Sequence, residues 1–494
     1  MPKHLRAPAA AAALALALAA PLATALPAHA DSTGMSALVS EDCTHGRLQL
    51  VLDNRTTASQ TFTVNWPGVG SWSRTVAAGG NTLLYFTRAD GTAYTFTTTT
   101  PTGFSNTQSG TTGCTLAAGT PQLDNTTILS TSTVIQGLNG ASGSYNGTVA
   151  SVRIPAMAVT DTGAVLAVAD ARVSSSGDLP NNIQLALSRS TDNGRTWSAP
   201  AIVVHAPTTS EGTGDASLVV DRSAGLNGRV YLFYNYGPAG IGFNSPASGS
   251  NSASDTASLH VQYVTSDDNG VTWSSPTDLN PQVKDASWGS LFASSGHGTQ
   301  LSSGRLVQPI VYRDAAGATH AADIYSDDHG TSWHTGGSAG SGVNESKAIE
   351  RSTGTVSQDM RSNSGAARWR ADSTDGGRTF AAASATALVD PGCNADQVSY
   401  LKPTDVDPTT GDPQRTATAL FSNNPSTSAR ANLTVRLSTD DGATWPNSAL
   451  LVPGTAGYST EAVLGDGSVG DLYEVGSTGG IFFDRFTLGW IQNS

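Results

Sequence analysis

The chain has 494 residues, which is more than one hydrophobic core usually serves, so we expect at least two domains. Only 13% of the residues are charged, and the formal net charge is −13. Nucleic acids and anionic membrane surfaces are bound by basic faces, so this balance argues against both as partners. After the N-terminal segment no stretch reaches the roughly 18 apolar residues that span a bilayer, so we expect no membrane insertion. We also expect a monomer.

The N-terminus has the pattern of an export signal. Lys3 and Arg6 precede an Ala/Leu-rich stretch, and the tripeptide Ala-His-Ala at 28–30 has the form of a cleavage site. We therefore predict a signal peptide over residues 1–30 and a secreted, extracellular protein.

Residues 31–118 contain short runs of alternating polarity, such as QTFTVNW at 60–66, separated by turn-rich pieces. This pattern predicts a small antiparallel β-sandwich, for which carbohydrate binding and a spacer role both remain open. Cys43 and Cys114 bracket it, and in an oxidising compartment we expect them to form a disulfide. Cys393 stands alone and is expected to be a buried, unpaired thiol. Residues 119–144 are interpreted as a linker.

From about residue 125 onward the sequence becomes repetitive. Five copies of the pattern S-x-D-x-G-x-[TS]-[WF], here called Asp-boxes, begin at residues 190, 266, 326, 373 and 438, each after a short apolar strand. Asp and Gly favour a tight hairpin, because Asp bonds nearby backbone N–H groups and Gly accepts positive φ. The terminal aromatic ring can then pack between neighbouring sheets. This spacing predicts an all-β propeller of about six blades over 145–494, in which the Asp-boxes stabilise outer turns and lie away from any active site.

Several motifs of the repeat region lie outside the Asp-boxes. They are VRIPAMAVTDTGAVLAVADAR (152–172), GDASLVVD (214–221), GVNESKAIE (342–350), NNPSTSARANLTVRLS (423–438) and GYSTEAVLGDGSVGDLYE (457–474). In content and order they resemble the secreted, retaining bacterial exo-sialidases, and the resemblance covers nearly all of residues 145–490. The sequence departs from the family at Val152, where Phe or Tyr is usual. It also departs at Gln358-Asp359-Met360, where the family usually has a Leu-Asn pair.

The resemblance implies a role for each matching residue. The catalytic residues are Asp178 as acid and base, Tyr458 as nucleophile and Glu345 as the group that activates it. Arg153, Arg361 and Arg430 grip the substrate carboxylate. Arg172, Asp215 and Glu474 complete the predicted substrate-binding set, with Asp215 meeting a ring hydroxyl and Glu474 holding Arg153.

These residue types suit the chemistry of sialic acids, which carry a carboxylate on the anomeric carbon itself. Guanidinium groups bind that carboxylate by charge-assisted hydrogen bonds at any working pH. A carboxylate nucleophile would be repelled there, whereas a neutral phenol is not, provided that a base such as Glu345 takes its proton. Asp178 would protonate the leaving oxygen and later deprotonate water. The reaction needs no metal or other cofactor.

The sequence therefore predicts a retaining exo-glycosidase that hydrolyses terminal α-linked sialic acid from glycans, glycoproteins or glycolipids. Three alternatives stay open. A related 2-keto-3-deoxy sugar acid, such as deaminated sialic acid, could be the substrate, since the departure at residues 358–360 leaves the pocket's preference open. A trans-sialidase would use the same catalytic residues, and a non-catalytic glycan-binding propeller would be expected to lose them.

Overall fold

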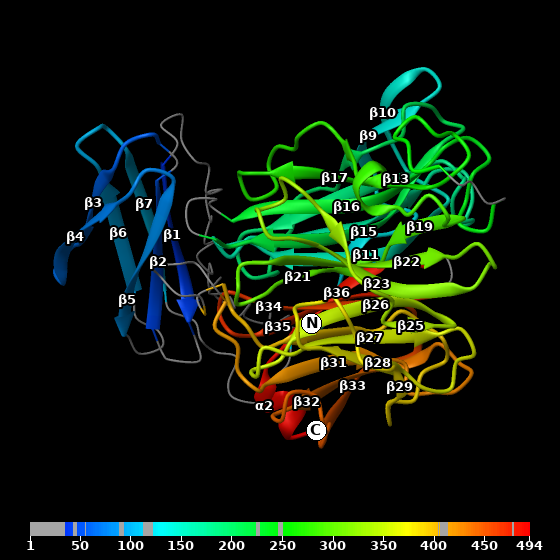
Figure 1. Ribbon diagram of the computed structural model, residues 1–494. Helices are drawn as coiled ribbons and strands as arrows, with labels where there is room; N and C mark the ends of the chain where they lie inside the picture. Colours follow the sequence, from blue (N-terminus) through cyan, green and yellow to red (C-terminus); the bar gives the residue numbers. More distant parts are fainter. Residues whose placement is uncertain are drawn as a thin grey trace, which may run out of the picture.

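The computed structural model describes residues 35–494 apart from gaps at 43–46, 55, 88–92, 112–121, 224–227, 246–249, 404, 406–412 and 477–478. Nearly all elements are strands. The described residues contain two short helices, α1 (Asn280–Val283) and α2 (Leu488–Gln492), and neither is long and apolar enough to cross a membrane. Figure 1 shows two parts, a small sandwich in blue and a larger propeller that contains the rest of the coloured chain.

The N-terminal part is the predicted β-sandwich. One sheet contains β1 (Met35–Asp42), β2 (Arg47–Asn54) and β5 (Gly80–Thr87). The other contains β4 (Gly70–Val76), β3 (Gln60–Trp66), β6 (Ala93–Thr99) and β7 (Ser105–Thr111). In β3 alternate side chains are buried, and the ring of Trp66 lies 4.7 Å from that of Phe96 in the core. Cys43 and Cys114 lie outside the described residues, so their disulfide stays a prediction.

The second part is a propeller, and its described residues form six sheets. The first sheet contains β9 (Ile135–Gly140), β10 (Gly143–Gly147), β11 (Ser151–Val159), β12 (Val165–Arg172), β13 (Ile183–Ser190) and β14 (Ala201–Val204). The second contains β15 (Gly212–Asp221), β16 (Arg229–Gly237), β17 (His260–Ser266), β18 (Thr277–Asp278) and β20 (Gly296–His297). The third contains β19 (Ser290–Ala293), β21 (Thr299–Gln300), β22 (Leu306–Arg313), β23 (Thr319–Ser326), β24 (His334–Thr335) and β25 (Gly340–Ser341).

The remaining sheets have four strands each. The fourth contains β26 (Val343–Glu350), β27 (Val356–Ser362), β28 (Trp369–Ser373) and β29 (Ser384–Ala385). The fifth contains β30 (Asp396–Ser399), β31 (Ala419–Asn423), β32 (Ala431–Ser438) and β33 (Asn447–Thr455). The sixth contains β34 (Ser459–Val463), β35 (Val469–Glu474), β36 (Ile481–Phe486) and β8 (Gln122–Leu129). The inner strands β11, β15, β26, β30 and β34 are almost entirely buried and contact one another around the centre.

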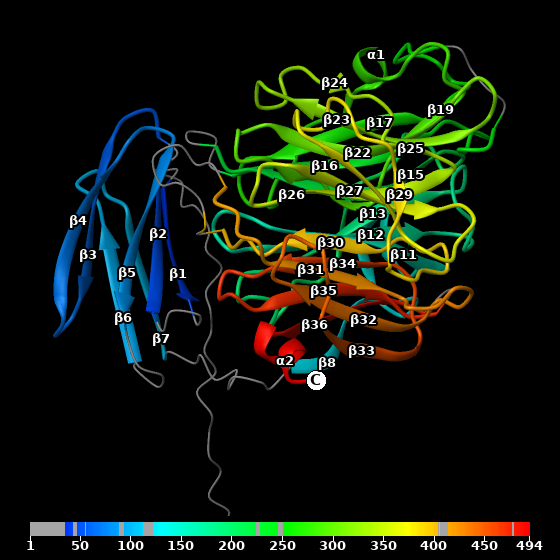
Figure 2. The same ribbon diagram turned by 60° about the horizontal axis from the view of Figure 1, so that its bottom comes forward.

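Strand β8 corrects the linker predicted at residues 119–144. It pairs antiparallel with β36, at the opposite end of the chain, and so completes the last sheet (Figure 2). Tyr473 Oη donates a 2.8 Å hydrogen bond to Asp484, whose other carboxylate oxygen accepts from the backbone N–H of Asn125 at 2.7 Å. Strands β9 and β10 then extend the first sheet. The segment is therefore part of the propeller, because it supplies the strand that its last sheet lacks.

The five Asp-boxes share one hydrogen-bond pattern. In the first, Ser190 Oγ donates to Asp192, and both the backbone N–H and the hydroxyl of Thr196 donate to the same carboxylate, at 2.9 and 2.6 Å. The other four boxes repeat these bonds at their own Ser, Asp and Ser/Thr positions. The box glycine has positive φ and sits against a neighbouring sheet; a Cβ on Gly330 would lie 2.3 Å from Tyr231 Oη. The boxes thus connect adjacent sheets, away from the cavity described next.

Candidate active site

Six of the nine predicted catalytic and substrate-binding residues line one cavity of about 430 Å³. They are Arg153, Asp178, Asp215, Glu345, Arg361 and Tyr458. The other three, Arg172, Arg430 and Glu474, do not line the cavity and instead contact residues that do. Residues that are hundreds of positions apart in the sequence therefore meet where the inner strands converge.

Bulges in the inner strands β11 and β15 change the direction of side chains that line the cavity. The pairing of β11 with β12 shifts register between Arg153 and Ala156, and Ile154 within that shift has φ of 59°. A similar shift occurs in β15 at Asp215, whose φ is 56°. Bulges bend a strand and redirect its side chains, and positive φ at a non-glycine residue is strained. Such strain concentrates at functional sites.

Tyr458 and Glu345 form the centre of the site. Tyr458 Oη donates to Glu345 Oε2 at 2.7 Å and accepts from Arg361 Nη1 at 2.9 Å. Burial and the negative charge of Glu345 raise the pKa of Tyr458 well above its usual value, so the phenol is protonated at rest. Burial would raise the pKa of Glu345, but Arg361, 2.6 Å from its carboxylate, and the bond from Tyr458 lower it overall. The arrangement is a neutral phenol that donates to an ionised carboxylate, as activation of the nucleophile by a general base requires.

Two further guanidinium groups flank the tyrosine ring. Arg153 and Arg430 lie 5.1 and 5.3 Å from its centroid. Glu474 accepts from Arg153 Nη2 at 3.2 Å and from the backbone N–H of Ile154 at 2.6 Å, which fixes both the arginine and the bulge beside it. With Arg361, three cations therefore surround the phenol, and they form a cradle suited to a small carboxylate.

Asp178 stands at the rim of the cavity with 79% of its side chain exposed. Arg172 Nη1 lies 2.8 Å from its carboxylate and donates to the carbonyl of Ser176 in the same loop at 2.7 Å. Arg172 itself is only 1% exposed, and its other nitrogen bonds Asp170 at 3.0 Å. The buried guanidinium of Arg172 therefore holds the Asp178 loop, and its contact with substrate stays a prediction.

Asp215 is held by the same buried network, because Asp170 contacts both it and Arg172. Its backbone N–H donates to Asp170 at 3.0 Å, and Asn235 donates to its carboxylate at 3.4 Å. Burial, and then the carboxylates of Asp170 and Glu345, raise the pKa of Asp215 well above its usual range. A carboxyl group with this property can donate as well as accept a hydrogen bond, which suits contact with a sugar hydroxyl.

One end of the cavity is apolar, which the sequence did not reveal. It is lined by Leu179, Phe243, Leu259 and Phe292, and the two phenyl rings meet edge to face at 4.8 Å. These residues come from loops and strands with ordinary apolar sequence, so no local signal distinguishes them from core residues.

The departure at residues 358–360 does not reach the cavity. All three residues are buried and none lines it. Asp359 instead accepts from the fully buried Arg368 at 2.7 Å, and Arg368 also donates to the carbonyl of Cys393 at 2.8 Å. Cys393 is an unpaired, buried thiol that packs under Tyr458, as predicted for its burial, and burial raises its pKa to about 12.

The described part of the chain contains no group of three or more His, Cys, Asp or Glu side chains arranged to hold a metal ion.

Comparisons with known proteins place the chain in a family. A family model described as a BNR repeat-like domain matches residues 163–470. The chain is 38% identical over 347 residues to a sialidase of Micromonospora viridifaciens, covering 69% of this chain and 52% of that protein. It is 32% identical over 339 residues to a sialidase of Bacteroides fragilis, covering 66% of this chain and 60% of that protein. The chain thus spans little more than half the length of these relatives.

A solved structure shows the same fold. The Hadza microbial sialidase Hz136 matches with a TM-score of 0.61 and 24% identity, over 92% of this chain and 96% of that one. Since the family model matches more than half of the chain and the similar proteins are sialidases, the chain belongs to the bacterial exo-α-sialidase family with BNR repeat-like domains.

Proposed function

We propose that the protein is a retaining exo-sialidase that hydrolyses terminal α-linked sialic acid from glycoconjugates. The observation that carries the proposal is the hydrogen-bonded trio of Tyr458, Glu345 and Arg361 inside a cavity that Arg153 and Arg430 flank. The two relatives are sialidases by name. An export signal at residues 1–30 would deliver the enzyme to extracellular glycans.

In the first step, Tyr458 Oη attacks the anomeric carbon while its proton passes to Glu345, 2.7 Å away. The glycosidic C–O bond breaks, and Asp178 gives its proton to the departing oxygen. In the second step, water attacks the same carbon as Asp178 takes a proton from it. The bond to Tyr458 then breaks, and the phenol recovers its proton from Glu345. Two displacements at one carbon give retention of configuration.

The three arginines determine how the sugar enters. Bound to its carboxylate, they place the anomeric carbon over the phenol and balance the negative charge that Tyr458 develops. The apolar end of the cavity, around Phe243 and Phe292, suits the methyl of an N-acyl group better than a hydroxyl. We therefore propose N-acetylated sialic acid as the preferred substrate over the deaminated sugar.

The test is release of the aglycone from paired fluorogenic sialosides, one N-acetylated and one deaminated. We expect the N-acetylated sugar to give the higher kcat/KM, and NMR of the first-formed sugar to show the α-anomer. Release from neither substrate would contradict the proposal. Transfer of the sugar to added lactose in preference to water would instead indicate a trans-sialidase.

Substitution of the nucleophile tests the site itself. Tyr458→Phe should lower kcat by about a thousandfold or more, because the covalent route is lost. Tyr234→Phe is the matched control, since Tyr234 is equally buried but bonds Gln262 in the second sheet. Equal activity of Tyr458→Phe and the unmodified protein would overturn the assignment of the nucleophile.

A further inference from the structure

A lysine that the reaction does not use lies buried directly behind the catalytic pair. Lys347 follows Glu345 by two residues on β26, and only 1% of its side chain is exposed. It does not line the cavity. Its Nζ donates to the carbonyl of Ser295 at 2.7 Å and to Asn394 Oδ1 at 3.0 Å. Burying an ammonium group costs free energy unless other groups pair with its charge, so the position of Lys347 needs an explanation.

The hydrogen bonds run from Lys347 to Glu345 in a fixed direction. An ammonium group can only donate, so the amide oxygen of Asn394 must face it. The amide nitrogen of Asn394 then donates to Ser295 Oγ at 2.9 Å. With its oxygen occupied, the hydroxyl of Ser295 donates to Glu345 Oε1 at 3.3 Å. The other carboxylate oxygen, Oε2, is thereby kept for Tyr458 and Arg361.

The effect of Lys347 on Glu345 depends on the other charged groups around that carboxylate. Glu345 is faced by Arg361 from β27, by Tyr458 from the turn before β34, by Asp215 from β15 and by Lys347 on its own strand.

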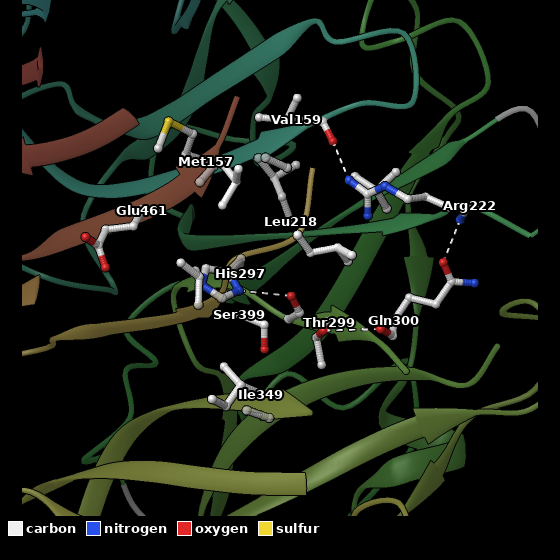
Figure 3. Close-up of a pocket in the computed structure, with 18 of the residues that line it drawn as sticks. Met157, Val159, Leu218, Arg222, His297, Thr299, Gln300, Ile349, Ser399 and Glu461 are labelled. Atoms are coloured by element: carbon white, nitrogen blue, oxygen red, sulfur yellow. Dashed lines mark hydrogen bonds between the residues drawn. The ribbon is translucent and has the colours of Figure 1, made fainter. Parts of the chain in front are cut away.

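Lys347 is faced in turn by carboxylates and one cation. They are Glu345, Asp359, Asp396 and Arg368. Asp396 lies 4.0 Å from Nζ and is shared with His297, whose Nε2 is 2.9 Å from its carboxylate. His297 belongs to the wall of a second, smaller cavity of about 110 Å³ (Figure 3), so Asp396 is already paired on that side.

We propose that Lys347 is a positioning residue for the general base: through Asn394 and Ser295 it orients the carboxylate of Glu345, and it places a cation next to it. This inference rests on the proposed sialidase function. If Lys347 had only a structural role, it would hold β26 against β30, and its removal would leave the pKa of Glu345 unchanged.

The test is the pH profile of kcat/KM for Lys347→Met on the N-acetylated fluorogenic sialoside. Loss of the cation removes an interaction that favours the carboxylate, so Glu345 would hold its proton to a higher pH and the acid limb should move up by about one pH unit. We expect kcat to fall by roughly 10- to 100-fold with a smaller change in KM.

Two further variants make the result decisive. Lys402→Met is the matched control, because Lys402 is 3% exposed and lies 3.6 Å from Asp405, outside both the cavity and the chain of bonds; its profile should match the unmodified protein. Lys347→Met with Asp396→Asn also neutralises the carboxylate 4.0 Å from the lost ammonium, and it replaces the single variant if that one does not fold.

An unshifted acid limb in a folded Lys347 variant would overturn the inference. Inactivity of the unmodified protein on every sialoside would be a failure of the proposed function instead.

Discussion

Asp178 differs from the other carboxyl groups of the cavity in being mostly exposed, and Arg172 holds its loop by contacts with Asp178 and with the carbonyl of Ser176. As the acid of the first step, Asp178 contributes more to the rate when the leaving oxygen is more basic. Asp178→Asn should therefore lower kcat/KM by about 10²- to 10⁴-fold for alkyl glycosides and much less for aryl glycosides with acidic phenols.

The measurement for Asp178→Asn is a series of aryl sialosides of graded leaving-group acidity. Asp314→Asn is a suitable control, because Asp314 is also at the surface but bonds His320 in the third sheet. A loss of equal size across the whole series would contradict the acid role.

Among individual residues, the sequence could predict those that carry reactive groups within distinctive motifs, such as Tyr458, Glu345 and Arg153. It could not predict groups that act through position alone. Lys347 stands in an ordinary strand, and its significance arises only because Ser295 and Asn394 come from other parts of the chain. The burial of Arg172 likewise could not be inferred from its motif.

Among the elements, the Asp-box turns show how local sequence becomes contact between sheets. Gly330 has φ of +77° and touches Tyr231 of the preceding sheet, whereas Gly317 has φ of +86° with nothing near it. Alanine is strained at both positions by about 1–2 kcal/mol, but only Gly330→Ala also forces a collision. Its free energy of unfolding should fall by about 1–3 kcal/mol more than that of Gly317→Ala.

Urea unfolding of the two glycine variants measures the difference. KM for the sialoside should stay unchanged in both, since neither residue lines the cavity. Equal losses of stability would show that the box does not pack tightly on its neighbour.

The sequence could predict these turns because the Asp-box is local. It could not predict that β8 completes the last sheet, because the partner strand β36 lies at the far end of the chain. The bulges at Ile154 and Asp215 were hidden for a related reason: they depend on how β11 and β15 meet their neighbours.

The whole molecule depends on a closed ring, because the site lies across the join between its last and first sheets. Glu474 and Tyr458 come from the sixth sheet and its preceding turn, and Arg153 comes from the first. The 3.2 Å contact between Arg153 and Glu474 spans this join, whereas β8 pairs with β36 inside the last sheet. The closure of the propeller thus brings the site residues together. The sequence motifs predicted the site residues more directly than they predicted this closure.

Buried carboxyl groups make the stability of this ring depend on pH. Asp323 in β23 is fully buried, and neither carboxyl oxygen has a hydrogen-bond partner among the described residues. Burial raises its pKa from 3.8 to about 8. As pH rises between these values, the unfolded chain loses this proton while the folded chain keeps it. Unfolding is therefore favoured by up to about 1.4 kcal/mol per pH unit.

The free energy of unfolding should accordingly decrease from about pH 5 to pH 7, and Asp323→Asn should reduce the slope. His260 contributes in the same direction, since its pKa is raised and its stabilisation is lost as pH rises through the folded value. It is present in both proteins, so the difference between their urea-unfolding curves isolates Asp323. Equal slopes would mean that Asp323 ionises in the folded state at an ordinary pH, and that water or a rearrangement of β23 reaches it.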